Sequence, residues 1–205
     1  MKNRIVVLPA VCALALLFSQ SALAQESPAT SPSFVSLVPD TPAAELFPRE
    51  DRTLDITGQY VAQVTDHRRD QLWGGSIGGS YYLFDRTAVV AQIPFYNADQ
   101  TGGARSFAGG ITLLARYHFL EIGRLSLFAD GGAGALLADN RVPPDGTNFN
   151  FTPQVGLGLT WRINDRLDLI GGSRFFHLSN AGIDGDKNPS INGAIEGYAG
   201  LMWRF

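Results

Sequence analysis

A two-residue alternation of side-chain character runs from about residue 52 to the C-terminus of this chain. In LDITGQYVAQV, residues 54–64, apolar or small residues occupy every second position, and most positions between them are polar. PQVGLGLTWRI, residues 153–163, repeats the pattern. Because successive side chains of a strand point to opposite faces, a period of two over such lengths predicts long β-strands.

Eight such runs can be marked before the chain ends, and no window among them has the pattern of an amphipathic helix. They cover residues 52–65, 71–85, 87–96, 105–120, 124–138, 150–164, 166–179 and 192–205. Tight connections alternate with longer loops near 66–70, 97–104, 139–149 and 180–191. Short turns at one rim and longer loops at the other are typical of bacterial outer-membrane barrels. The predicted fold is therefore all-β, an eight-stranded antiparallel transmembrane β-barrel over residues 52–205.

A soluble barrel or sandwich in the periplasm would also alternate, but three features favour the membrane. The runs mostly exceed the roughly 9–11 residues that a strand needs to cross hydrocarbon. The second face carries Gly, Thr, Gln and single charges, which suits a narrow, filled lumen. Aromatic residues gather at strand ends, where interfacial girdles lie; they are Tyr81, Tyr82, Phe84, Tyr117, Phe119, Trp203 and Phe205. Closure of the sheet is required, because bare edges in lipid would leave backbone groups unpaired.

The N-terminal residues predict export. Lys2 and Arg4 precede a short apolar run, and Ala22-Leu23-Ala24 forms a cleavage site, so residues 1–24 read as a signal peptide. Residues 25–51 are Pro- and Ser-rich without periodicity and read as a loosely held segment, with a short helix at 42–47 as an option. We therefore expect the outer membrane of a Gram-negative bacterium as the location.

Composition limits the chemistry. The only cysteine, Cys12, lies inside the signal peptide, so the mature chain has no thiolate or disulfide. With three histidines in the chain, little is left for a metal site, and we expect no cofactor. The net charge of −3 gives no sign of a nucleic-acid partner.

One polar pair stands out in FFHLSNAGIDGDKNP, residues 175–189, where a predicted strand meets a polar loop. His177 and Ser179 share the parity of Leu167, Leu169 and Phe175, the face that should meet lipid. An even number of strands brings both termini to one rim, which should be periplasmic, so the pair should lie near the outer leaflet. A polar pair facing lipid is costly unless it is functional. The alternative is an interfacial histidine beside an ordinary strand-end serine.

The i, i+2 spacing puts the two Cα atoms about 6.5 Å apart on one side of the strand. A modest bend then lets an imidazole nitrogen reach the serine oxygen, and a neutral imidazole can take the serine proton and return it to a leaving group. The pair is therefore a candidate for nucleophilic catalysis on a lipid ester.

The sequence HLSNAG followed by NPSIN resembles the lipid A 3-O-deacylase (PagL-type) family of outer-membrane acyl hydrolases, most closely over residues 172–205. The resemblance implies Ser179 as nucleophile, His177 as general base, and the backbone amides of Asn180 and Gly182 as the oxyanion pocket. The third catalytic residue of the family is expected to be Glu, but Asn192 stands at the matching position. Glu196 is the alternative, although its parity places it on the lumenal face.

The resemblance implies a carboxylic ester hydrolase that removes an ester-linked acyl chain from lipid A, in lipopolysaccharide of the outer leaflet. A non-catalytic barrel with a structural or adhesive role is the first rival. The second is a narrow pore with Arg116, Asp130, Arg162 and Arg174 inside, although eight strands leave hardly any room for solute. Which acyl position is cleaved, and whether the lipid is lipid A or a phospholipid, stays open at this stage.

Overall fold

The computed structural model describes residues 46–64, 70–183 and 190–205. The predicted signal peptide and most of the segment 25–51 lie outside these residues. In the described part of the chain there is no helix of the length and hydropathy needed to cross a membrane.

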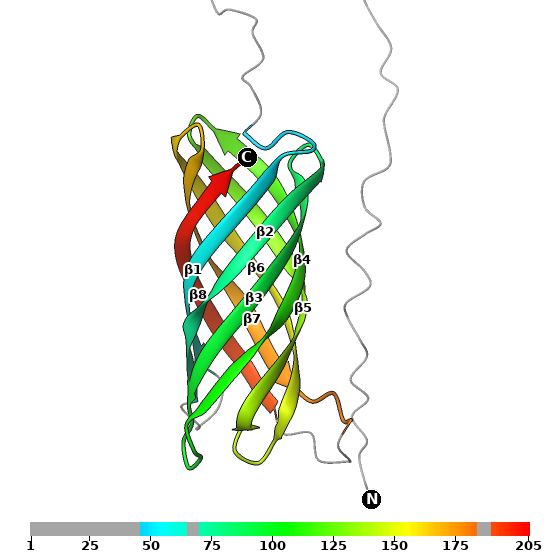
Figure 1. Cartoon of the computed structure of the whole chain (residues 1–205), viewed down its shortest axis with the longest axis vertical. Helices are drawn as coiled ribbons and strands as arrows, with labels where there is room; N and C mark the ends of the chain where they lie inside the picture. Colours follow the sequence, from blue (N-terminus) through cyan, green and yellow to red (C-terminus); the bar gives the residue numbers. More distant parts are fainter. Residues whose placement is uncertain (1–45, 65–69, 184–189) are drawn as a thin grey trace, which may run out of the picture. The chain divides into compact units, whose positions relative to one another are not determined.

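Eight strands form one closed barrel in chain order (Figure 1). They are β1 (Arg52–Gln63), β2 (Gln71–Phe84), β3 (Thr87–Asp99), β4 (Ser106–Ile122), β5 (Leu125–Val142), β6 (Thr147–Asn164), β7 (Leu167–Ser179) and β8 (Ser190–Arg204). Every neighbour is antiparallel, and β1 pairs with β8 to close the sheet. The predicted fold class is confirmed.

The hairpin of β5 and β6 is longer than predicted, since the sequence suggested strand ends at 138 and a restart at 150. Val142 pairs with Thr147 in the structure. Asn150 Nδ2 donates to the carbonyl of Val142 at 3.0 Å, and Asn148 Nδ2 donates to that of Ala138 at 3.0 Å. Amide side chains thus extend a hairpin that the alternation alone did not reveal.

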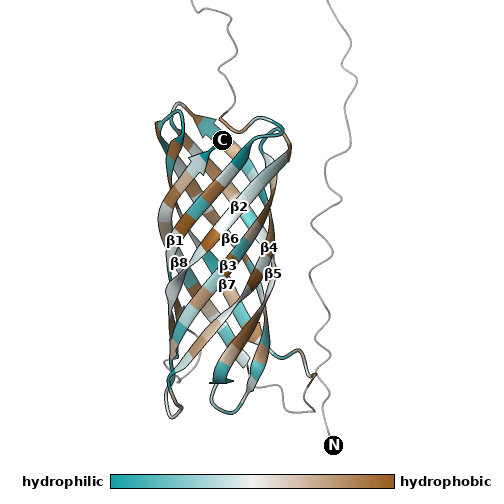
Figure 2. Ribbon diagram, in the orientation of Figure 1, coloured by the Kyte–Doolittle hydropathy of each residue, from teal (hydrophilic) through white to brown (hydrophobic). Residues whose placement is uncertain are grey.

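The outer face of the sheet carries exposed apolar side chains, which is the reverse of a soluble barrel. Ile56, Ile93 and Leu157 are 50%, 62% and 62% exposed on the outside, whereas Asp55 and Thr57 are buried within. Figure 2 shows the resulting change of colour from residue to residue along the strands. An apolar exterior around an interior that contains polar and charged side chains is the arrangement of a membrane barrel, as the alternation predicted.

The two ends of the barrel differ. Connections of residues 85–86, 123–124 and 165–166 lie at one end, together with Leu46 and Phe205, and we call it the short-turn end. The connections 100–105 and 143–146 lie at the other, the long-loop end, where β7 finishes and β8 begins. The predicted alternation of short and long connections is therefore present.

Side chains fill the interior in three layers. An apolar cluster at the short-turn end contains Leu46, Phe47, Tyr82, Ala88, Phe128, Ile170, Tyr198 and Met202. A second apolar cluster lies toward the long-loop end and includes Phe176, Leu178 and Ile191. Between them, along the strands, Asp130 binds both Arg116 at 3.0 Å and Arg174 at 2.8 Å, and Arg174 also binds Glu196 at 3.2 Å.

One residue that was expected in the aromatic girdle, Tyr82, does not lie there. Tyr82 is 0% exposed and lies inside the barrel, whereas its neighbour Tyr81 is 40% exposed on the outside. Two consecutive strand residues cannot both face lipid, because their side chains alternate. Tyr82 is therefore part of the interior and not of the aromatic girdle.

Candidate functional site

The histidine and serine of the HLS motif meet at the long-loop end of β7. His177 Nε2 lies 3.0 Å from Ser179 Oγ, within hydrogen-bonding distance. Phe176 and Leu178 are buried in the interior cluster, so the alternating residues His177 and Ser179 are on the outer face of the barrel. The geometry lets a single proton pass between imidazole and hydroxyl at the membrane-facing surface.

Asn192 on β8 joins this pair. A side-chain hydrogen bond connects it to His177. Its amide nitrogen donates to Ser190 Oγ at 2.6 Å, so its amide oxygen is the atom that can accept from an imidazole N–H. Since Nε2 faces Ser179, the ring nitrogen suited to Asn192 is Nδ1. The three residues thus form the chain Ser–His–Asn on two neighbouring strands.

Glu196, the alternative partner of His177, lies on the other face of β8. It is fully buried in the interior, where Tyr96 OH donates to its Oε1 at 2.8 Å and Arg174 to its Oε2 at 3.2 Å. Both carboxylate oxygens are therefore engaged inside the barrel, on the opposite side of the sheet from the imidazole. Of the two residues, the structure brings only Asn192 to His177.

The turn after Ser179 carries the two predicted oxyanion donors. Ala181 and Gly182 have positive φ values of 54° and 77°. The backbone N–H of Gly182 donates to Asn180 Oδ1 at 3.0 Å, and the Nδ2 of Asn180 is buried without a hydrogen-bond partner. The Gly182 amide is thus held by the Asn180 side chain, which must rotate before that amide can bind another oxygen.

The surroundings of Ser179 are partly apolar. Phe151 of β6 is its cross-strand partner, and the ring of Phe151 packs edge-on against Phe149 with centroids 5.0 Å apart. A shallow hollow of about 310 Å³ next to them is lined by Thr147, Asn148, Phe149, Asn180 and Ile183. Ser179 itself is only 6% exposed, so its hydroxyl lies within a recess of the outer surface.

A second histidine–serine pair, which the sequence reading did not identify, lies in the interior. His118 Nδ1 is 2.7 Å from Ser126 Oγ, and His118 Nε2 is 3.0 Å from Tyr82 OH. The ring of Phe47 stacks on His118 with centroids 3.8 Å apart. The only sign of this cluster in the sequence is that His118 occupies a position of its strand that faces the interior.

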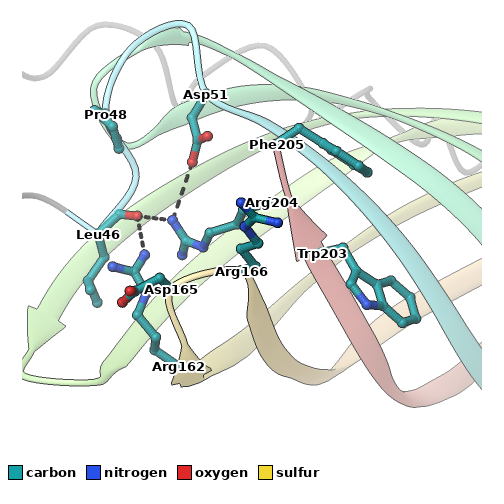
Figure 3. A pocket seen from close by; sticks show the side chains of 9 residues that line it. All are labelled: Leu46, Pro48, Asp51, Arg162, Asp165, Arg166, Trp203, Arg204 and Phe205. Carbon is teal, nitrogen blue, oxygen red and sulfur yellow. Dashed lines mark hydrogen bonds and ion pairs between the residues drawn. The ribbon is translucent and has the colours of Figure 1, made fainter.

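The short-turn end also has a hollow, of about 830 Å³, which Figure 3 shows. Three of its charged side chains, Asp51, Arg162 and Arg204, are engaged with the chain itself. Arg162 and Arg204 both donate to the carbonyl of Leu46, and Arg204 forms an ion pair with Asp51 at 3.3 Å. These contacts hold residues 46–51 against the barrel.

No metal centre is present among the described residues, where His, Cys, Asp and Glu form no group of three or more that could hold an ion.

The fold defines the class of the protein, an eight-stranded outer-membrane β-barrel, and the family follows from the sequence. The model of the lipid A 3-O-deacylase (PagL) family matches residues 79–199, more than half of the chain. The chain belongs to this family, and its location is the outer membrane of a Gram-negative bacterium. No curated protein matches the chain.

Solved structures share the fold at low identity. Neisserial surface protein A is 12% identical, with a TM-score of 0.52 over 75% of this chain and 94% of that one. Outer membrane protein W of E. coli is 9% identical, with a TM-score of 0.51 over 77% and 99%. The outer membrane enzyme PagL is 17% identical, with a TM-score of 0.48 over 74% and 98%.

Proposed function

We propose that the protein is an outer-membrane serine esterase that removes an ester-linked acyl chain from lipid A at the outer leaflet. One observation carries the proposal: a serine hydroxyl 3.0 Å from an imidazole on the lipid-facing surface, with Asn192 bonded to the same ring. Membership in the lipid A 3-O-deacylase family supplies the substrate class and favours the ester at position 3.

The proposed orientation follows from the two ends of the barrel. Bacterial barrels have short turns in the periplasm and longer loops outside the cell. The short-turn end would then be periplasmic, and the end of β7 would lie near the outer leaflet. Lipid A is the lipid of that leaflet, so an ester of a bound lipid A molecule would approach Ser179 sideways from the membrane.

The reaction would begin with attack of Ser179 Oγ on the ester carbonyl while its proton passes to His177 Nε2. The tetrahedral intermediate collapses when the imidazolium returns that proton to the sugar oxygen, which leaves as an alcohol. Water then attacks the acyl-enzyme, again with His177 taking the proton, and a free fatty acid leaves with the serine restored. No cofactor enters either half of this cycle.

Asn192 and the turn after the serine would assist. An amide oxygen accepting the Nδ1–H of His177 fixes the ring tautomer, although it stabilises imidazolium less than a carboxylate does. The backbone N–H groups of Asn180 and Gly182 would stabilise the oxyanion, the latter after Asn180 Oδ1 releases it. This release makes the oxyanion pocket dependent on substrate binding.

The test compares the lipid A of cells that produce the wild type, Ser179→Ala or Ser173→Ala. Ser173 is a matched control, since it is an exposed serine on the same strand. We expect the mass of one acyl chain to be missing in cells with the wild type and with Ser173→Ala, and to be present with Ser179→Ala. Identical spectra for all three, with equal amounts of folded protein in the outer membrane, would overturn the proposal.

The strongest rival is a non-catalytic barrel with a structural or adhesive role, and the amide at position 192 in place of a carboxylate is its support. It predicts that His177→Ala leaves the lipid A unchanged. A transport pore is disfavoured because the ion pairs of Arg174 with Asp130 and Glu196 lie in the lumen and fill part of it.

A further inference from the structure

The outward position of Asn192 conflicts with the regular alternation of β8. Ala194 and Glu196 are fully buried in the interior, and Asn192 lies an even number of residues before both of them. In an unbroken strand, residues two apart face the same side of the sheet. A regular β8 would therefore direct Asn192 into the lumen, away from His177.

An irregularity between β7 and β8 reverses the alternation at this point. Phe176 pairs with Ala194 and Leu178 pairs with Ile191, so His177 alone faces two residues of β8, Asn192 and Gly193. This arrangement is a β-bulge, which inserts one extra residue into a strand and re-aims its side chains. Ile191 consequently lies in the interior cluster and Asn192 is exposed outside.

Gly193 gives the bulge its geometry. Its φ is +60°, a left-handed value at which a Cβ collides with the neighbouring carbonyl. Its carbonyl accepts a hydrogen bond from the backbone N–H of Val64 at 3.1 Å, which fixes the bulged peptide to the neighbouring strand. Of the ordinary residues, Asn and Asp tolerate this conformation best after glycine, whereas β-branched residues tolerate it worst.

We propose that Gly193 is a positioning residue of the esterase: its left-handed bulge turns Asn192 outward so that the amide meets His177. The expected effect on catalysis rests on the proposed function. The expected effect on the tautomer of His177 does not, because it depends only on the contact with Asn192. Gly193 itself touches no reacting atom, and its effect on turnover passes entirely through Asn192.

The first test substitutes Gly193 and measures release of fatty acid from purified lipid A in detergent. Gly193→Val should lower kcat by about tenfold, the value of one hydrogen bond to the imidazole, with KM unchanged. Gly193→Asn should keep most of the rate. Gly197→Ala is the control, because Gly197 is exposed on the same strand with no atom within 4 Å of an added Cβ. Equal rates for Gly193→Val and the wild type would overturn the proposal.

The second test combines Gly193→Val with Asn192→Ala. If the glycine acts through the asparagine, the double variant is no slower than Asn192→Ala alone. Additive losses would show that Gly193 acts in another way and would overturn the proposal.

A measurement without turnover separates this inference from the proposed function. In refolded protein with ¹⁵N-labelled histidine, NMR reports the tautomer of each of three imidazoles. We expect one fixed tautomer for His177 in the wild type and in Gly193→Asn, and a mixture in both Gly193→Val and Asn192→Ala. A fixed tautomer in Gly193→Val refutes the positioning role. Absence of deacylation by the wild type refutes the esterase and leaves this readout intact.

Discussion

Among the described residues the barrel contains two histidine–serine pairs, one toward each end, and their hydrogen-bond lengths do not distinguish them. His118 and Ser126 are 2.7 Å apart near the short-turn end, and His177 and Ser179 are 3.0 Å apart near the long-loop end. The surroundings differ. The first pair lies in the lumen under the ring of Phe47, whereas the second lies on the face that meets lipid.

The third partner differs as well. Tyr82 places a hydroxyl on the second nitrogen of His118, in a chain of buried hydrogen bonds that no substrate can enter. Asn192 places an amide beside His177, next to a surface that a lipid can approach. Contact between serine and histidine is therefore not sufficient evidence of a catalytic site, and access for a substrate is what separates the outer pair from the buried one.

The serines should separate the two pairs most strongly. Ser179→Ala removes the proposed nucleophile and should lower the rate of deacylation by about ten-thousandfold or more. Ser126→Ala should leave that rate unchanged, because its hydroxyl is sealed in the lumen. The rate of fatty acid release by each purified, refolded protein measures both. A large loss in Ser126→Ala would mean that the interior pair takes part in the reaction.

The histidines should differ almost as much. His177→Ala removes the proposed general base, and such a group is worth about a hundredfold to ten-thousandfold in rate. His118→Ala should keep the activity but lower the free energy of unfolding by about 1–3 kcal/mol for each buried hydroxyl left without a partner. Urea titration in detergent micelles, followed by tryptophan fluorescence, gives the stability. Equal stability of His118→Ala and the wild type would contradict a structural role for the interior pair.

Phe47 covers the interior pair, and removal of its ring tests how much this contact stabilises the barrel. Phe47→Ala should lower the free energy of unfolding by about 3 kcal/mol, as for other large-to-small changes in a core. Deacylation should not change, because the ring lies at the opposite end from His177. The same urea titration and activity assay apply, with exposed Phe205→Ala as the control for loss of an aromatic ring at this end.

The smallest effect on the rate is expected for Asn192, the proposed orienting residue. Asn192→Ala should slow deacylation by about tenfold, the contribution of one hydrogen bond. Asn192→Glu should match or exceed the wild-type rate, because a carboxylate stabilises imidazolium better than an amide does. Tyr82→Phe, the equivalent change at the interior pair, should leave the rate unaltered. A rate for Asn192→Glu as low as that of Asn192→Ala would show that charge at this position does not help.

The alternation of side chains was enough to predict the barrel, its eight strands and the outward parity of His177 and Ser179. The alternation failed to predict the structure where a bulge or a side-chain hydrogen bond interrupts the two-residue period. The extension of β5 and β6 depends on the amides of Asn148 and Asn150. The outward turn of Asn192 depends on a bulge, for which the dipeptide Asn192-Gly193 was the only local sign.

The contacts of the segment before the barrel were the feature that the sequence predicted least well. Residues 25–51 have no periodicity, and nothing in them marked Phe47 as a core residue. Its burial depends on groups that are distant in the sequence: Tyr82 and His118 stack with the ring at centroid distances of 5.2 and 3.8 Å, and the Arg204 guanidinium lies 4.2 Å above it. Because these neighbours come from several strands, the sequence of residues 25–51 alone could not predict that Phe47 is buried.

The same contacts make the complete docking of Phe47 depend on closure of the sheet. Tyr82 lies on β2, His118 on β4 and Arg204 on β8, so the ring has its full set of neighbours only when the last strand is paired with the first. A shortened chain that begins at Arg52 would keep all eight strands but would lack the ring that stacks on His118 at this end of the lumen.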